Sequence, residues 1–426
     1  MSGPAPLGGV LARWREQHSH APVLGDVIEV VDVEVLRLGR PGVVDVVAEM
    51  DGRLAHAVLG IRRPGDQLRS LGGAEEPALG TVEDADGEGL VVDALHVADA
   101  ARVLLETVAG LSGGANGDLE TVSVVRDDDE ATALAFDRRY LLTVFPWLFR
   151  GPHPGAALLA GLDEAGFNHL PAPVAFWRRA GRDLGVVQEL LSGASSGWAL
   201  AIGSLRDVIA SGVQPAAAGG DFAPEALALG TMAARMHVAL ERAFGRRAGD
   251  VANWVDELDP DVLAAAAEGQ RSGFAATSAE DLLASLRRSG LRLPTIRTHG
   301  DLHLGRVART DHGWVLADCM PGGTAPGTEE PLFRCPLADV ADLTWSLWHA
   351  AQVAAGERGP ASLGLASSET ALAWQARNRR ALLAAYLATP GIGPLLPADR
   401  RVVRRLLAMF ELARAARGPS EPAPAR

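Results

Sequence analysis

The stretch IRTHGDLHLGRVARTDHGWVLADC, residues 296–319, decides the fold of this chain. It leads into the segment HGDLH at His299–His303 and closes on Asp318. A turn at Asp311–Gly313 separates two short apolar runs, which predicts a hairpin. The expected strands of this hairpin are residues 307–309 and 314–317. Such a hairpin brings the loop carboxylate of Asp301 close to the strand-end carboxylate of Asp318.

Two carboxylates in this arrangement are what phosphoryl transfer needs. One of them orients the attacking hydroxyl and accepts its proton, and the other holds Mg²⁺ on the phosphates. The tripeptide HGD alone is a weak signal. The segment HGDLH, the hairpin and the strand-end Asp318 together are much more specific, and they predict the catalytic loop of a phosphotransferase.

The composition is that of a globular protein. The chain has 426 residues, 40 of them basic and 53 acidic, and a net charge of −13, with 48% hydrophobic residues. These values exclude a disordered chain and argue against a general nucleic-acid binder. The two cysteines, Cys319 and Cys335, cannot form a disulfide framework, which favours a reducing compartment. Neither a signal peptide nor a membrane span is apparent, so we expect a cytoplasmic protein.

The order of elements favours an α+β fold, because strands come first and helices follow. The expected strands are residues 27–36, 42–50, 54–60, a β-rich block at 117–149, 174–177 and 185–190. The expected helices are residues 96–109, 154–165, 224–242, 336–351 and 401–416. The tail 418–426 (GPSEPAPAR) is expected to be frayed.

The segment 296–319 resembles the catalytic loop of the aminoglycoside-phosphotransferase-like kinases, whose fold is similar to that of protein kinases. Within that superfamily the chain most resembles the maltokinase-like group. Further matching stretches follow in the expected order. They are VVQELL at 186–191 with Gly197-Trp198, LGTMAARMH at 229–237, PLADVA at 336–341 and Phe410-Glu411-Leu412. The stretch DCMPGG at 318–323, together with HGDLHLGR, also resembles the glucosamine kinases of actinobacteria, a branch of this group.

The resemblance implies a bilobal, protein-kinase-like fold with a β-rich N-terminal cap and a mainly helical C-terminal lobe. The implied division is a cap at 1–92, the rest of the nucleotide-facing lobe at 93–191, a helical lobe at 192–417 and the tail. The cofactors implied are ATP and Mg²⁺.

The resemblance also implies roles for the residues of the loop. Asp301 is expected to be the catalytic base and Asp318 the principal Mg²⁺ ligand. His299 is expected to brace the loop, and His303 is expected to lie near the metal or the acceptor. Gln188, Glu189 and Leu190 are expected at the hinge between the lobes, where backbone groups meet adenine.

The chain departs from the family where phosphates and metal are held. Five residues after the catalytic Asp the family has Asn or Gln as a second metal ligand, but this chain has Arg306, which cannot coordinate a cation. The phosphate-binding Lys and its partner Glu are replaced near Thr143 and Ala157. Their joint loss avoids an unpaired buried charge. We expect Arg306 to supply part of the missing cationic clamp on the nucleotide.

The acceptor side has shifted from basic to acidic. The helix that carries arginines in maltokinases reads PLADVADLTWS here, with an added Asp342. An acidic pocket favours a cationic acceptor, and Trp345 is the tryptophan expected to stack on a sugar ring. Glu329, Glu330 and Glu411 are further acidic candidates. The candidate acceptor-binding residues are therefore Asp301, His303, Asp342, Trp345 and Glu411.

These features predict a kinase that transfers the γ-phosphate of ATP to the 6-hydroxyl of glucosamine. Maltose or an aminoglycoside as acceptor remains an alternative, because only the acceptor pocket would differ. A catalytically dead pseudokinase is a further alternative, although the retention of both Asp301 and Asp318 argues against it. The expected partners are an amino sugar and ATP, with no nucleic acid and no membrane, and the chain is expected to be a monomer or a weak homo-oligomer.

Overall fold

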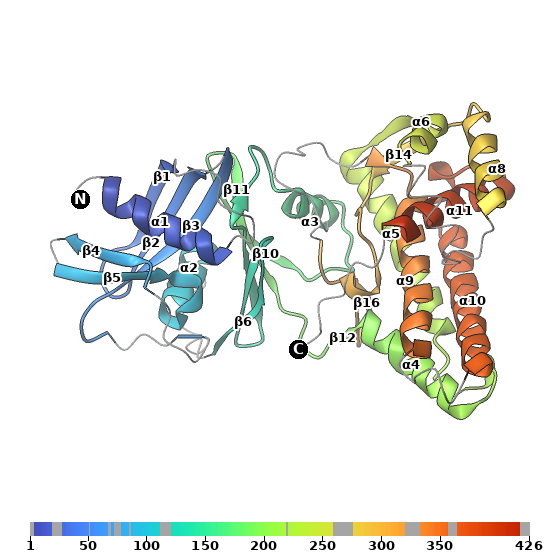
Figure 1. Cartoon of the computed structure of the whole chain (residues 1–426), viewed down its shortest axis with the longest axis horizontal. Coiled ribbons are helices and arrows are strands. Elements are labelled where there is room, and N and C mark those ends of the chain that lie inside the picture. Colours follow the sequence, from blue (N-terminus) through green and yellow to red (C-terminus); the bar gives the residue numbers. More distant parts are fainter. Residues whose placement is uncertain are drawn as a thin grey trace. The chain divides into compact units, whose positions relative to one another are not determined.

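The computed structural model describes residues 4–18, 28–50, 52–66, 70–71, 78–84, 87–110, 121–218, 220–258, 276–319, 333–356 and 364–417. The chain divides into two compact units, whose elements are labelled in Figure 1. The first unit consists of residues 1–157, 171–192 and 323–329, and the second of residues 158–170, 193–322 and 330–426. The expected boundaries at residues 92, 191 and 417 stay predictions.

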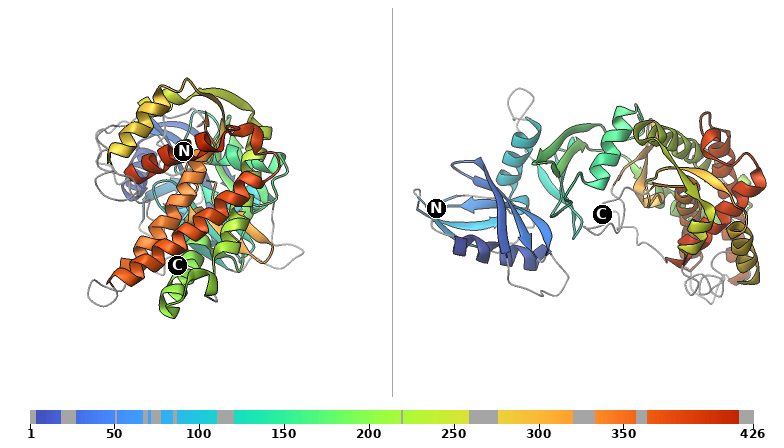
Figure 2. Two further views of the ribbon diagram at one scale, coloured as in Figure 1. Left: turned by 90° about the vertical axis from the view of Figure 1, so that its right-hand side faces the viewer. Right: turned by 90° about the horizontal axis from the view of Figure 1, so that it is seen from above.

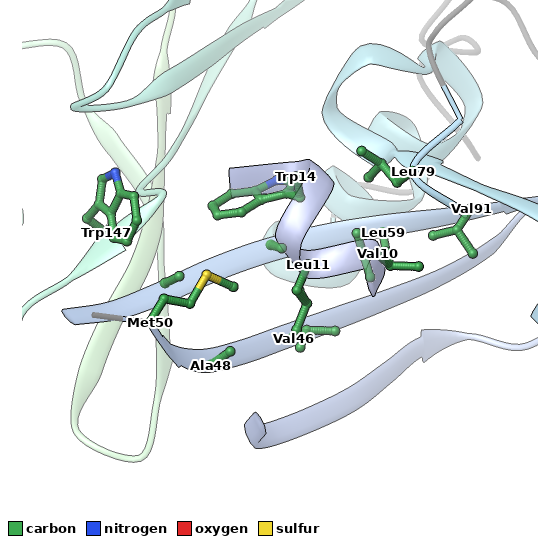
Figure 3. Close-up of a cluster of buried hydrophobic side chains, with 12 residues drawn as sticks. Val10, Leu11, Trp14, Val46, Ala48, Met50, Leu59, Leu79, Val91 and Trp147 are labelled. Carbon is green, nitrogen blue, oxygen red and sulfur yellow. The ribbon is translucent and has the colours of Figure 1, made fainter. Parts of the chain in front are cut away.

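The first unit begins with helix α1 (Pro4–His18) packed on a six-stranded sheet. The strands follow the order β1-β2-β3-β5-β4, and β9 pairs with β3. They are β1 (Ile28–Arg37), β2 (Gly42–Met50), β3 (Arg53–Arg62), β4 (Gly80–Asp84), β5 (Gly87–Asp93) and β9 (Trp147–Leu148). Figure 3 shows Leu11 and Trp14 of α1 beside Val46 and Met50 of β2. The helix thus covers the apolar face of the sheet, as a half-buried sheet requires.

A second, five-stranded sheet completes the first unit. Its order is β10-β11-β8-β7-β6 and all its pairs are antiparallel. The strands are β6 (Val122–Asp127), β7 (Thr132–Phe136), β8 (Tyr140–Val144), β10 (Pro173–Arg179) and β11 (Arg182–Glu189). Helix α2 (Ala98–Ala109) follows the short helix η1 (Ala94–His96) and contacts strands of both sheets. The two sheets therefore share one helix as packing partner.

A buried polar cluster also joins the two sheets of this unit. Asp45 of β2 accepts a hydrogen bond from Arg179 of β10 at 2.6 Å, and its other oxygen lies 2.9 Å from Nε2 of His56 on β3. Arg179 also contacts Glu34 at 2.7 Å and Asp32 at 2.9 Å on β1. Asp45 and His56 are almost fully buried, so each needs the other groups of the cluster as partners.

The second unit is mainly helical. Its long helices are α4 (Gly197–Ser211), α5 (Ala223–Phe244), α9 (Leu337–Gly356), α10 (Gly364–Ala388) and α11 (Arg400–Ala416), and α6 (Val251–Asp256) and α8 (Ala276–Arg287) are shorter. Helix α9 packs against α4, α10 and α11. It lies side by side with α10, which the orange ribbons of Figures 1 and 2 show. Helix α3 (Pro154–Glu164) begins in the first unit and ends in the second.

Two small sheets carry the candidate site of this unit. One has the order β12-β15-β16 and the other β13-β14-β17. Their strands are β12 (Ser195–Ser196), β13 (Arg246–Asp250), β14 (Arg292–Arg297), β15 (Val307–Thr310), β16 (Gly313–Leu316) and β17 (Phe333–Arg334). The turn between β15 and β16 confirms the predicted hairpin.

The predicted α+β order is confirmed, with the two larger sheets in the first unit and most of the long helices in the second. No bounds were predicted for helices α1, α4, α6, α8 and α10. The run 117–149 was expected as one β-rich block and contains four strands, β6 to β9, from residue 122 onward. Within the part of the chain that the structure describes, no helix is both long and apolar enough to cross a lipid bilayer.

Candidate active site

The catalytic-loop segment leaves β14 and turns sharply at Gly300. The backbone of Gly300 has φ +87°, a left-handed conformation that glycine adopts without strain. The chain then forms the short helix η3 (Leu304–Arg306) before β15 begins. The side chain of His303 caps η3, because its Nδ1 accepts a hydrogen bond from the Gly305 amide at 3.0 Å. The loop is thus held between two small sheets.

A buried carboxylate on α9 anchors this loop. Asp339 accepts hydrogen bonds from the backbone amides of His299 at 2.8 Å and Gly300 at 2.9 Å. Its Oδ2 also lies 3.1 Å from Nε2 of His237, whose Nδ1 lies 2.9 Å from the Tyr386 hydroxyl. Burial works against ionisation of Asp339, but hydrogen bonds from His237 and Gly300 hold its pKa below the usual value. One carboxylate therefore fixes the turn that precedes Asp301.

The structure brings Asp301 and Asp318 together through one arginine. Arg306 donates from Nη2 to Asp301 Oδ2 at 3.1 Å and from Nη1 to Asp318 Oδ2 in a very short contact. His303 lies 3.5 Å from the same oxygen of Asp301. Two of the three predicted loop companions of Asp301, His303 and Arg306, thus contact its carboxylate.

The charges around Asp301 favour its ionised form. Burial by itself raises its pKa, but the hydrogen bond from His303 and the charges of His303 and Arg306 lower the pKa to about 2. Asp301 is therefore a carboxylate at neutral pH. It can orient a hydroxyl and take a proton that leaves late in the reaction.

His299 contacts the backbone of the loop from within. It is buried, and its Nε2 lies 2.9 Å from the backbone oxygen of Asp318. Its Nδ1 accepts a hydrogen bond from the Asp301 amide at 3.3 Å. Burial lowers the pKa of His299, which favours a neutral ring. This ring ties the backbone of the loop to the segment after β16.

The acidic side chains of the loop suit a magnesium ion that takes most of its ligands from phosphates and water rather than from the protein. Mg²⁺ is commonly held by one or two carboxylates together with substrate phosphates and water. Asp318 is a carboxylate of this kind. Among the residues that the structure describes, no group of three or more His, Cys, Asp and Glu side chains forms a metal-binding cluster. The residues fit a cation held mainly by Asp318, and Arg306 contacts an oxygen of that same carboxylate.

The residues predicted to bind adenine lie at the end of β11 in the first unit. Gln188 is buried, and its side-chain amide lies 3.5 Å from the backbone oxygen of Pro171. The amides of Glu189 and Leu190 donate to the backbone oxygens of Ala172 and Arg139. These two amides are thus already hydrogen-bonded within the unit, and an adenine contact by this segment stays a prediction.

Two predicted acceptor residues lie on α9. Asp342 is buried, and its Oδ1 lies 3.3 Å from Arg414 Nε without forming a hydrogen bond. Trp345 is buried one turn further along, with the Arg414 guanidinium 4.1 Å from its ring centroid. Burial raises the pKa of Asp342 to about 8, although Arg417 and Arg414 oppose this shift. Arg414 thus contacts both predicted acceptor residues of this helix.

Glu411 of α11 is already paired. Arg379 of α10 contacts both of its carboxylate oxygens, at 2.9 and 3.0 Å, and the Thr344 hydroxyl donates to it at 2.8 Å. Glu411 and Trp345 line a cavity of about 930 Å³ formed by α9, α10 and α11. Four arginines also line it, namely Arg379, Arg380, Arg400 and Arg404. Arginines outnumber the glutamate in this cavity, and the acidic pocket predicted for the acceptor side stays a prediction.

The raised pKa of Asp342 makes the stability of the fold depend on pH. The folded chain keeps a proton on Asp342 between about pH 4 and 8, where the unfolded chain has lost it. The free energy of unfolding should therefore fall as pH rises through this window, by about 1.4 kcal/mol per pH unit for one such group. Asp342→Asn should flatten the dependence of the melting temperature on pH between 5 and 8, measured against wild type.

The exposed Glu369 of α10 offers a matched control for this measurement. Glu369→Gln removes one carboxylate without changing a buried site, so its melting temperature should follow the wild-type pH profile. If Asp342→Asn also followed the wild-type profile, Asp342 would titrate normally in the folded chain.

Sequence reasoning missed the anchor of the loop. Asp339 and His237 both lie in stretches quoted for the family resemblance, PLADVA and LGTMAARMH, but neither received a role. An acidic residue among apolar ones in a buried helix was the available signal, since such a charge needs partners. Tyr386 lies on α10, which was not predicted.

Some predicted features lie outside the described residues. These are residues 320–323 of the stretch DCMPGG and the acidic candidates Glu329 and Glu330. Cys319 and Cys335 are both buried and free, and burial raises the pKa of each thiol. Neither is therefore a reactive thiolate.

Known proteins resemble this chain in sequence and in fold. The chain is 30% identical over 272 residues to a glucosamine kinase of Streptacidiphilus jiangxiensis, a match that covers 58% of each sequence. It is 31% identical over 236 residues to a glucosamine kinase of Mycolicibacterium smegmatis, covering 51% of this chain and 56% of the relative. The matches thus span less than two thirds of these curated relatives. No family model matches the chain.

A solved structure shares the fold over almost the whole chain. It is a glucosamine kinase in complex with glucosamine, ADP and inorganic phosphate. The TM-score is 0.69 at 22% sequence identity, and the match covers 98% of this chain and 94% of the other. The predicted kinase-like α+β fold is therefore confirmed.

Proposed function

We propose that this chain is an ATP- and Mg²⁺-dependent kinase that phosphorylates glucosamine at its 6-hydroxyl, giving glucosamine 6-phosphate and ADP. The observation that carries the proposal is the pairing of Asp301 with Asp318 across Arg306 in a loop anchored by Asp339. These are the groups that an in-line transfer from ATP requires. Two glucosamine kinases among the sequence relatives, and the solved structure of a glucosamine kinase with the same fold, support the choice of acceptor.

Asp301 positions the acceptor in this proposal. Its carboxylate accepts a hydrogen bond from the sugar hydroxyl, whose oxygen forms a bond to the γ-phosphorus while the bond from that phosphorus to the bridging oxygen of ADP breaks. The hydroxyl proton passes to Asp301 as the new bond forms. A carboxylate with a pKa of about 2 is a weak base, but the loose transition state of phosphoryl transfer depends more on orientation than on base strength.

Asp318 would hold Mg²⁺, which neutralises charge on the phosphates when it is bound. Arg306 lies between the two acids and is the cation of the loop that can reach toward a phosphate, in place of the missing lysine. Its planar guanidinium suits phosphate oxygens. Gln188, Glu189 and Leu190 are proposed to contact the nucleotide, and His303, Asp342, Trp345 and Glu411 the sugar.

A pseudokinase is the second candidate, and one observation favours it. The contact of Arg306 with both acids is an arrangement that a chain without catalysis could also keep. A ligand that binds only the folded state raises the melting temperature. Stabilisation by Mg·ATP at millimolar concentration, with no turnover of any acceptor, would favour this candidate over an enzyme.

Release of ADP from Mg·ATP, measured in a coupled assay, tests the proposed activity. The acceptor panel is glucosamine, N-acetylglucosamine, glucose, maltose and kanamycin. We expect turnover of glucosamine at a kcat/KM at least tenfold above that of glucose, because an amine adds a charge that a carboxylate can recognise. If maltose or kanamycin were the preferred acceptor, the proposal of glucosamine would be wrong. Phosphorus NMR of the product identifies the hydroxyl that is phosphorylated.

A further inference from the structure

Arg306 spans the two acids of the candidate site with a single guanidinium. Nη2 bonds Asp301 Oδ2 at 3.1 Å, and Nη1 bonds Asp318 Oδ2. The side chain is 15% exposed, and its Nε is buried without a hydrogen-bond partner. In this position the arginine makes two charge-assisted hydrogen bonds and leaves a third donor unused.

The backbone of Arg306 is fixed, so that only its side chain is free to change position. Its amide donates to the His303 oxygen at 2.9 Å, and its carbonyl accepts from the amides of Ala317 at 2.9 Å and Asp318 at 3.3 Å. The segment that carries Asp318 is therefore attached to the residue whose side chain pairs with Asp318. A movement of the guanidinium does not require a movement of either acid.

A guanidinium and a divalent cation compete for the same carboxylate. Both need Asp318, and a positive charge within hydrogen-bond distance of Oδ2 repels a second cation at that oxygen. The two acids carry two negative charges, and Arg306 already neutralises one of them. A nucleotide supplies several negative phosphate oxygens, which offer the guanidinium other partners.

We propose that Arg306 is a latch on the metal site, which keeps a divalent cation from Asp318 until a nucleotide polyphosphate draws the guanidinium away. This inference rests on the proposed function, because it assigns Asp318 to the metal. The cation then enters with the nucleotide rather than before it. The chain thereby couples metal binding to nucleotide binding through one side chain.

Binding of Mn²⁺ to the purified full chain, followed by electron paramagnetic resonance without nucleotide, tests the latch. Arg306→Gln should bind Mn²⁺ at least tenfold more tightly than wild type, because the amide is neutral and cannot pair with both acids. Adding ADP should strengthen Mn²⁺ binding to wild type by a larger factor than to the variant. The Arg306→Gln, Asp318→Asn double variant should lose the gained affinity.

Arg309 provides the matched control. It lies on β15 three residues further along and pairs with Glu225 at 2.9 Å, away from both acids. Arg309→Gln removes one positive charge from the same hairpin, so its Mn²⁺ affinity should stay within about twofold of wild type. A gain as large as that of Arg306→Gln would show a general charge effect and overturn the latch.

Equal Mn²⁺ affinity in wild type and Arg306→Gln would also overturn the latch, as would a gain that survives Asp318→Asn. Neither result bears on turnover, so the proposed kinase would still stand. Conversely, tighter Mn²⁺ binding by Arg306→Gln, together with no ADP release by the wild-type chain with any acceptor, would support the latch and overturn the proposed function. The two proposals can therefore fail separately.

Discussion

Asp301→Asn is expected to lower kcat for glucosamine about a thousandfold while the chain stays folded. Asparagine keeps the shape of the side chain but cannot accept the hydroxyl proton. The contact with Arg306 also weakens, because the amide carries no charge. The KM for ATP should change much less than kcat, since the lost interaction belongs to the acceptor hydroxyl. The coupled ADP-release assay measures both constants.

Asp311 supplies a control for this substitution. It is exposed in the turn of the same hairpin, so Asp311→Asn changes one acid near the site without touching the loop. Its kcat should equal that of wild type. Turnover of Asp301→Asn at the wild-type rate would exclude Asp301 as the proton acceptor, whatever the acceptor sugar.

Asp339→Ala is expected to cause the largest loss of stability. The change removes the acceptor of two backbone amides and of His237 in a fully buried place. Breaking such a buried network by removing one partner costs about 3–5 kcal/mol. The free energy of unfolding in urea should fall by an amount of this order. The surviving folded protein should also lose kcat, because the turn before Asp301 is no longer held.

Tyr386→Phe separates the anchor from the rest of its network. It removes only the hydroxyl next to His237 and leaves Asp339 with its amide partners. We expect a loss of about 1 kcal/mol and little change in kcat. If Asp339→Ala lost no more stability than Tyr386→Phe, the loop would be held by other contacts than this carboxylate.

Strands β1 to β3 of the first sheet could be predicted well because their side chains alternate or are β-branched, whereas β4 and β5 of the same sheet were not predicted. The predicted strand 42–50 has the observed bounds of β2, and the strand 54–60 lies within β3. Helix α1 was missed because its apolar face is short. The function of that face is seen only when the helix is packed on the sheet that it covers. Helix α10 was missed because apolar residues occur all around a helix that packs on both α5 and α9.

The closeness of the loop residues was predictable where neighbours in sequence are also neighbours in space. Asp301, His303 and Arg306 lie close together in the sequence, and the hairpin brings Asp318 next to Arg306. The contact of Asp339 with the loop was not predictable in this way. Asp339 lies 40 positions from His299, whose amide donates a hydrogen bond to it. The sequence also does not reveal which groups Arg306 contacts. The same side chain can pair with the two acids, as observed, or with phosphate, as predicted.

The cluster of Asp45, His56 and Arg179 bears on the order in which the chain folds during synthesis. Arg179 follows Asp45 by 134 residues. Strand β10 must therefore leave the ribosome before the buried carboxylate of Asp45 can pair with the Arg179 guanidinium. Until then Asp45 has His56 beside it but lacks the arginine, which disfavours the closed form of the earlier sheet. The nascent first unit should therefore complete its folding only after Arg179 has been synthesised.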